Sequence, residues 1–310
     1  MTSRKISLLT ATIALGGCVD SPAAVSGEHH QYIVTGLYLP RSASDASKKF
    51  GIDLDNDGRK DNGLGSVLAT LIGHGFDIQP TLNDAVLRGN ILLGLDVQTP
   101  NFTDAEAAGV QVVTGITTSP SACNTAATCG LHLRGDALML TNEAVPQMYG
   151  TGPVADGTLL TRGEILPVRL AVGDDNYIDL NLHYAAVQLK LAGDTPTGIL
   201  AGVVLTEDVD RVLIPQFGKQ FRRIAAEDCS PPAPVRLRKH RCQCNPDSRG
   251  DLLIELFDRD QDCTIADAEI SSNSIARTLL ASDVFRDDKY IGLSFGVGIS
   301  LAPATFVSAR

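Results

Sequence analysis

Tryptophan is absent from this 310-residue chain, and aromatic residues make up only 5% of it. Sites that stack sugars or nucleobases need such side chains, so these ligand classes are poorly supported. Charged residues are also scarce at 20%, and 36 acidic residues outweigh 26 basic ones, for a net charge of −10. This negative charge disfavours binding of a polyphosphate backbone and favours binding of hard cations. We therefore expect no nucleic-acid partner.

Two common functional motifs are missing as well. The chain has no phosphate-binding glycine loop and no His-Glu-x-x-His zinc motif, and no residue is assigned a catalytic role. With 44% hydrophobic residues it can nevertheless bury a sizeable core, which excludes wholesale disorder.

The N-terminus resembles the export signal of bacterial lipoproteins. Arg4 and Lys5 form a basic region, and an apolar run over 6–15 follows that is too short to span a bilayer. Leu15-Gly16-Gly17-Cys18 resembles a lipobox. The resemblance implies a lipoprotein signal peptide over 1–17 and a lipid-modified Cys18; the alternative is an ordinary secretory signal beside a chance cysteine.

This resemblance implies a membrane partner, reached through the lipid on Cys18. The small, polar residues 18–30 are expected to form a tether, followed by a single β-rich domain over 31–310. Val19 follows the cysteine directly, in the place of the Asp that resembles an inner-membrane retention signal. We therefore expect the protein in the bacterial cell envelope, at the outer membrane or cell surface.

Six further cysteines indicate disulfides, because an even number in an exported chain is typical of them. Cys123 and Cys129 close a small loop and are expected to pair. The pairing of the other four is left open: Cys229, Cys242, Cys244 and Cys263. A zinc site beside His240 is the alternative, but the Cys-x-Cys spacing and the lack of a second half disfavour it.

Alternating apolar residues predict an α+β fold that is mainly β, with an antiparallel β-sandwich-like core and several short helices. The clearest strand is 290–302, where large apolar residues alternate with Gly and Ser. Its small-residue face predicts the close approach of another element. Further strands are expected, among others, near 32–39, 91–97, 110–116, 131–140, 166–172, 178–184 and 199–205, and helices at 64–72, 78–87 and 207–226, the last kinked or divided at Pro215.

The first of two acidic loops reads Asp-Leu-Asp-Asn-Asp-Gly-Arg-Lys-Asp over 53–61. Alternate carboxylates converge on one cation when the chain curls around it, and Gly58 takes the required positive φ at little cost. The loop resembles the calcium loops of EF-hands and, more closely, those of thrombospondin type 3 repeats, although Leu64 stands where an EF-hand has its final acid. The implied ligands are Asp53, Asp55, Asp57, the backbone carbonyl of Arg59, and Asp61.

The second acidic loop resembles an EF-hand loop over all twelve positions of 258–269. Cys263 stands where glycine is expected, and a disulfide from it would hold the required backbone geometry. Apolar stripes on both sides predict a C-terminal EF-hand-like helix-loop-helix, placed in a disulfide-rich insertion over 229–282. The implied ligands are Asp258, Asp260, Asp262, the backbone carbonyl of Thr264, and Glu269. For both loops the alternative is a metal-free turn rich in Asp.

Together these features resemble lipoproteins of Gram-negative bacteria for which no activity is known. The expected cofactor is calcium, and the expected function is a lipid-anchored envelope protein that binds a ligand or partner, or has a purely structural role. The alternative is an exported hydrolase of surface polymers with structural calcium. A pocket with two facing carboxylates about 5–10 Å apart would favour the hydrolase.

Overall fold

The computed structural model describes residues 24–125, 128–141, 148–173, 176–193, 195–230 and 241–308. The predicted signal peptide, Cys18 and the first part of the predicted tether lie outside these ranges. The first strand begins at Glu28, so residues 28–30 belong to the sheet and not to a tether. The described chain is mainly β with several short helices, which confirms the coarse fold prediction.

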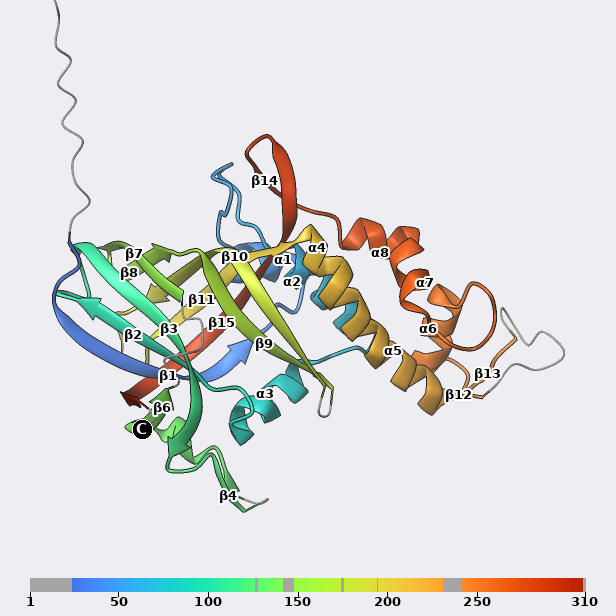
Figure 1. Ribbon diagram of the computed structural model, residues 1–310, viewed down its shortest axis with the longest axis horizontal. Helices are drawn as coiled ribbons and strands as arrows, with labels where there is room; N and C mark the ends of the chain where they lie inside the picture. Colours follow the sequence, from blue (N-terminus) through green and yellow to red (C-terminus); the bar gives the residue numbers. More distant parts are fainter. Residues whose placement is uncertain are drawn as a thin grey trace, which may run out of the picture.

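The strands form one large mixed sheet and two small hairpins (Figure 1). The large sheet contains β1 (Glu28–Tyr38), β2 (Leu93–Thr99), β3 (Ala105–Ser119), β6 (Ala137–Thr141), β7 (Met148–Ala155), β8 (Thr158–Arg162), β9 (Ile165–Gly173), β10 (Asn176–Lys190), β11 (Thr197–Leu205), β14 (Val284–Arg286) and β15 (Lys289–Ser308). The hairpins are β4 (Cys123–Thr125) with β5 (Thr128–Cys129), and β12 (Cys229–Ser230) with β13 (Gln243–Cys244).

The large sheet closes on itself. β1 pairs with both β2 and β15, and antiparallel pairings continue from β2 through β3, β7, β8, β10 and β11 back to β15. β6 pairs antiparallel with β3 but parallel with β15, which makes the sheet mixed. This arrangement differs from the predicted antiparallel sandwich-like core. The difference arises because β3 and β15 are long, with 15 and 20 residues. Each of these strands therefore pairs with different strands along its length.

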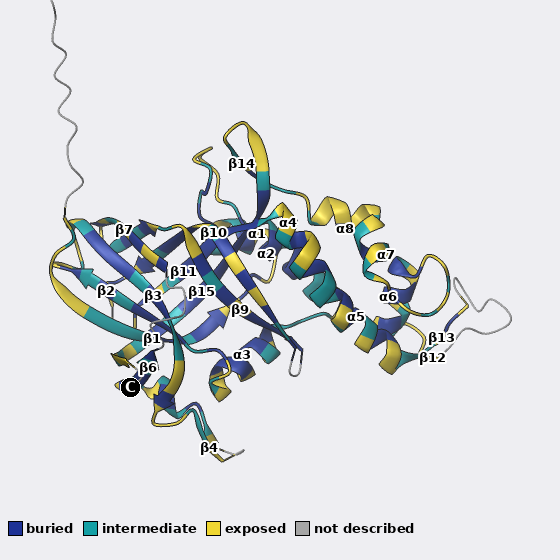
Figure 2. Cartoon of the chain, in the orientation of Figure 1, coloured by how far each residue is buried: buried dark blue, intermediate teal, exposed yellow. Residues whose placement is uncertain are grey.

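In Figure 1 the helices lie mostly toward one end of this closed sheet, and α5 to α8 extend away from it. They are α1 (Ala43–Phe50), α2 (Gly63–Gly73), α3 (Gln79–Arg88), α4 (Thr206–Asp208), α5 (Ile214–Asp228), α6 (Arg249–Phe257), α7 (Asp267–Ser272) and α8 (Ser274–Leu279), with a short 3-10 turn over Leu131–Arg134. Figure 2 shows that buried residues continue from the strands into the inner faces of α2 and α5. One apolar core therefore joins the sheet to the helices.

The small-residue face of β15 lies against α1 and the start of α2. A Cβ at Gly296 would stand 2.0 Å from the carbonyl oxygen of Phe50, so only glycine fits there. The buried Asn62, at the N-cap of α2, donates from Nδ2 to the Gly296 carbonyl at 2.9 Å and accepts the Gly296 N–H at 2.9 Å. The predicted close approach is thus confirmed.

The long helical segment after β11 is divided, as predicted, ahead of Pro215. A π-helical turn over Val209–Leu213 separates α4 from α5. Proline has no N–H to donate back along the helix, and the π turn ends directly before the helical turn that contains Pro215. The predicted strand over 131–140 is wrong in its first half, because Gly130, Gly135 and Asp136 have positive φ and leave a 3-10 turn between them.

Candidate metal centres

The first acidic loop lies between α1 and α2. Ile52 and Asp61 form an isolated antiparallel bridge across its base, with the Asp61 N–H donating to the Ile52 carbonyl at 3.0 Å. Within the loop, one carboxylate oxygen each of Asp53, Asp55 and Asp57 lie within 4.8 Å of one another. The structure therefore brings together three of the predicted ligands.

Three hydrogen bonds curl this loop. Asp53 Oδ2 accepts the N–H of Gly58 at 3.1 Å, and Asp55 Oδ1 accepts that of Asp57 at 3.2 Å. Asp57 Oδ1 in turn accepts the N–H of Arg59, the predicted carbonyl ligand, at 2.7 Å. The backbone has positive φ at Asn56 (65°) and Gly58 (86°), the fourth and sixth positions of the loop.

The second acidic loop, between α6 and α7, repeats this pattern position by position. Asp258 Oδ2 accepts the N–H of Cys263 at 3.0 Å, and Asp260 Oδ1 accepts that of Asp262 at 3.2 Å. Asp262 Oδ1 accepts the N–H of Thr264 at 2.8 Å. Positive φ again falls at the fourth and sixth positions, which are Gln261 (63°) and Cys263 (69°).

The three aspartates of this second loop also converge, with one oxygen each within 4.8 Å. Asp258 is the most buried of them, and burial raises the pKa of its carboxyl group. Two segments distant in sequence thus share one loop conformation, and each draws three carboxylates together. A cation offers the charge that such a cluster needs to stay ionised.

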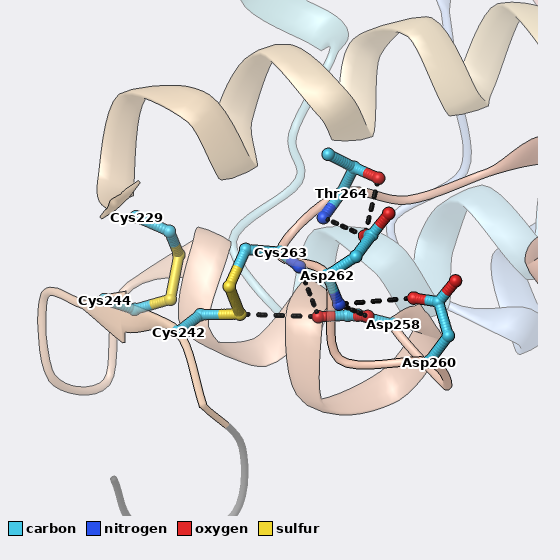
Figure 3. The surroundings of a disulfide bond; sticks show 8 residues. All are labelled: Cys229, Cys242, Cys244, Asp258, Asp260, Asp262, Cys263 and Thr264. Carbon is cyan, nitrogen blue, oxygen red and sulfur yellow. Dashed lines mark hydrogen bonds between the residues drawn. A yellow bond between two sulfur atoms is a disulfide. The ribbon is translucent and has the colours of Figure 1, made fainter. Parts of the chain in front are cut away.

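A disulfide fixes the position at which the second loop departs from an EF-hand. Cys263 pairs with Cys242, and Cys229 pairs with Cys244 beside it (Figure 3). The Sγ of Cys242 lies 3.3 Å from Asp258 Oδ2, but a disulfide sulfur has no proton, so this is a packing contact. The left-handed backbone of Cys263 is therefore tied covalently to a neighbouring segment, as the sequence led us to expect.

The same pairings bear on the zinc alternative. Zinc is held by thiolates, and the sulfurs of these four cysteines are oxidised in two disulfides. The third disulfide joins Cys123 and Cys129, which confirms the predicted pair. His240 lies outside the described residues. The Cys242–Asp258–Cys263 grouping is accordingly a disulfide beside a carboxylate.

The last acid of each loop closes it in a similar way. Glu269 Oε1 accepts the N–H of Arg259, the second residue of its loop, at 2.7 Å, and Oε2 accepts that of Ala266 at 2.9 Å. Asp61 Oδ2 accepts the N–H of Leu54, also a second residue, at 2.7 Å. Asp61 therefore closes its nine-residue loop in the same way that Glu269 closes its twelve-residue loop. Leu64, at the twelfth position counted from Asp53, is buried in the core.

Electrostatics single out Asp61. Desolvation by burial, followed by the charges of Asp55, Asp283 and Asp57, raises the pKa of Asp61 to about 6. Asp283 was not predicted from the sequence, where it stands alone, far from the loop. It precedes β14 and accepts the N–H of Ser294 at 2.6 Å. The turn before β15 therefore brings a further carboxylate near the first loop.

Two arginines also hold this first loop from outside. Arg162 of β8 donates to the Asp53 carbonyl at 2.9 Å, and Arg286 of β14 donates to the Leu54 carbonyl at 2.7 Å. The N–H of Phe285 donates to Asp55 Oδ2 at 3.1 Å. The loop is thus fastened to two strands of the sheet, so a change in its charge acts directly on the fold.

The chain contains one match to the Gly-x-Ser-x-Gly pattern of serine hydrolases, from Gly292 to Gly296. It was not recognised from the sequence, and it lies inside β15. Ser294 at its centre is fully buried, donates its hydroxyl to Asp283 and accepts the N–H of Gly63 at 2.6 Å. A nucleophile elbow needs a sharp strand-to-helix turn, and Ser294 is instead paired with Val203 in continuous strand. We therefore assign Ser294 a structural role.

A cavity of about 680 Å³ between the α4–α5 segment and α7–α8 holds two carboxylates, Asp210 and Asp267. Asp267 accepts from Arg222 at 2.6 Å, and Arg222 also donates to the Ile265 carbonyl at 2.9 Å. Asp267 is therefore engaged in an ion pair with Arg222, and the structure assigns this cavity no catalytic group.

No protein-family model, curated protein or solved structure matches this chain. Within the part of the chain that the structure describes, no helix is both long and apolar enough to cross a bilayer.

Proposed function

We propose that this chain is a calcium-stabilised, lipid-anchored protein of the bacterial cell envelope with a binding or structural role. The observation that carries the calcium assignment is the shared conformation of the two acidic loops. The bonds from the sixth to the first position are 3.0 and 3.1 Å long, and those from the fifth to the third are both 3.2 Å. Positive φ falls at the same two positions of each loop.

In this proposal each loop holds one calcium ion. Calcium takes six to eight oxygens at about 2.3–2.6 Å, so it accepts carboxylates, backbone carbonyls and water together. Its ligands in the first loop are Asp53, Asp55, Asp57, the Arg59 carbonyl and Asp61; those in the second are Asp258, Asp260, Asp262, the Thr264 carbonyl and Glu269. The second loop with α6 and α7 acts as an EF-hand-like helix-loop-helix.

The envelope location is supported by three disulfides, which persist in oxidising compartments. The lipid anchor rests on the lipobox-like segment ending at Cys18. The role of the ions is mechanical, because each loop is fastened to other segments of the chain. The first connects α1 and α2 with β8 and β14, and the second lies between α6 and α7, beside the two disulfides.

Isothermal titration calorimetry tests the calcium assignment. Chelator-treated protein is titrated with calcium, and the account predicts two ions bound per chain. Glu269→Gln should remove or weaken one site and Asp53→Asn the other, while Glu106→Gln, at an exposed position of β3, serves as a charge-matched control. Absence of calcium binding by the folded protein would refute the assignment, as would equal losses in all three variants.

A further inference from the structure

An apolar groove lies among α2 and the helices α5, α6, α7 and α8, which extend from the sheet in Figure 1. Its volume is about 310 Å³, and apolar side chains line almost all of it. Four of the nine phenylalanines of the chain meet there: Phe76, Phe217, Phe221 and Phe257. The ring of Phe221 stacks on that of Phe257 with centroids 5.5 Å apart, which makes one wall rigid and aromatic.

Solvent reaches this groove along α6 and α8. Leu252 of α6 is 39% exposed, and Ile275 and Leu279 of α8 are 53% and 37% exposed. Apolar side chains gathered at the mouth of a groove mark a binding site more often than single exposed ones do. The volume also falls at the lower end of the range of about 300–1,000 Å³ that small-molecule pockets occupy.

A second cavity, of about 220 Å³, shares Leu71, Phe76, Phe217 and Phe221 with the first. Its character is different, because Gln220, Arg223 and Arg249 contribute to its lining. The structure gives Arg249 no salt bridge to a carboxylate in the described residues, whereas Asp77, the acid at this cavity, is paired with Arg41 at 2.6 Å. A positive end thus adjoins an apolar groove on a chain whose net charge is −10.

We propose that these two adjoining cavities, which have four lining side chains in common, together bind a free single-chain amphiphile with an anionic head, such as a long-chain carboxylate. The hydrocarbon chain lies among the phenylalanines, and the carboxylate lies at Arg249. The positive charge at one end favours this ligand, because a purely apolar ligand would not form an ion pair with Arg249. A slot of this volume also matches one chain better than the two chains of a phospholipid.

Binding of cis-parinaric acid, a fluorescent long-chain carboxylate, tests the proposal on the whole mature protein with submillimolar calcium and micromolar probe. Its methyl ester is the neutral counterpart. We expect one acid molecule bound per chain. Arg249→Gln should weaken binding of the acid about fivefold, which corresponds to the free energy of an exposed ion pair. It should leave binding of the ester unchanged. Ile275→Asp should abolish binding of both, because it places a charge at the mouth of the groove.

Matched controls change an exposed residue of the same type elsewhere: Arg134→Gln and Ile116→Asp should bind both probes as wild type does. Palmitate should displace the probe, and phosphatidylglycerol vesicles should not. Binding of neither probe by wild type, an equal effect of Ile116→Asp, or displacement by vesicles alone would overturn the proposal. A concentration-dependent dimer that Ile275→Asp dissociates would also overturn it, since a second copy would then be the occupant.

Discussion

Cys263 and Gly58 hold the same backbone position in two separate loops. Cys263 has φ 69° and donates its N–H to the first aspartate of its loop, and Gly58 has φ 86° and does the same in the other. Glycine adopts this conformation freely, whereas a residue with a Cβ is strained by about 1–2 kcal/mol. The disulfide from Cys263 to Cys242 ties the strained position to a neighbouring segment.

The loss of stability on removing this disulfide should therefore depend on which residue replaces Cys263. Changing Cys242 and Cys263 both to Ser should lower the free energy of unfolding by about 2–3 kcal/mol, because the unfolded chain regains freedom. Cys242→Ser with Cys263→Gly should lose about 1 kcal/mol less, because glycine takes the positive φ without strain. Urea unfolding in saturating calcium measures both. Equal losses would show that the backbone position is not strained.

The pKa of Asp61 predicts how the calcium-free protein responds to pH. The folded-state pKa is raised to about 6, above the ordinary value of 3.8, so folding favours the protonated form. The stabilising contribution of protonation is full below the unfolded pKa and is lost as pH rises through the folded pKa. In chelator the melting temperature should fall from about pH 4 to about pH 7.

Asp61→Asn is the control for this pH dependence, since the amide keeps the shape of the carboxyl group and does not titrate. Its melting temperature in chelator should be higher than that of wild type at neutral pH, and its fall across the same range should be smaller. An identical pH profile for the two proteins would assign the effect to another group.

The proposed lipidation of Cys18 predicts how the protein partitions in cells. Wild type should fractionate with membranes, and globomycin should leave unprocessed precursor. Cys18→Ala should remain unprocessed or lose its anchor, because the acylated thiol is missing. Cell fractionation with mass measurement of the mature chain decides the matter. A Cys18→Ala protein that stays with membranes at the wild-type mature mass would contradict the lipobox assignment.

The contact between Gly296 and Phe50 predicts a large loss of stability from one added methyl group. Gly296→Ala would place a Cβ against a backbone carbonyl, so we expect it to lower the free energy of unfolding by about 2–3 kcal/mol. Gly73→Ala at the end of α2 meets nothing within 4 Å and should be neutral or stabilising by up to about 1 kcal/mol. Similar denaturation midpoints for the two variants would show that the sheet yields at Gly296.

Local pattern was enough to predict many elements of this fold. The alternation in 290–302 gave β15, the helical spacing gave α2 and α3, and both acidic loops were located from the order of their aspartates. These features depend on residues near one another in sequence. The same is true of the Cys123–Cys129 disulfide, which closes a small hairpin.

Features that depend on contacts between distant residues could not be predicted from the sequence, for a physical reason. Closure of the sheet depends on β1 pairing with both β2 and β15, and no local periodicity encodes a strand's second partner. Asp283 reaches the first loop only because the chain turns between β14 and β15. The apolar groove was hidden for the same reason, since Phe76, Phe217 and Phe257 each look like ordinary core residues until α2, α5 and α6 pack together.

Thermal melting with and without calcium tests the central claim most directly. The account predicts that millimolar calcium raises the melting temperature of chelator-treated wild type by about 5 °C or more, since a hundredfold excess over Kd contributes about 2.7 kcal/mol. Glu269→Gln should lose more of this rise than Asp53→Asn, because the second loop has the longer closing acid. An unchanged melting temperature of wild type on adding calcium would contradict the account.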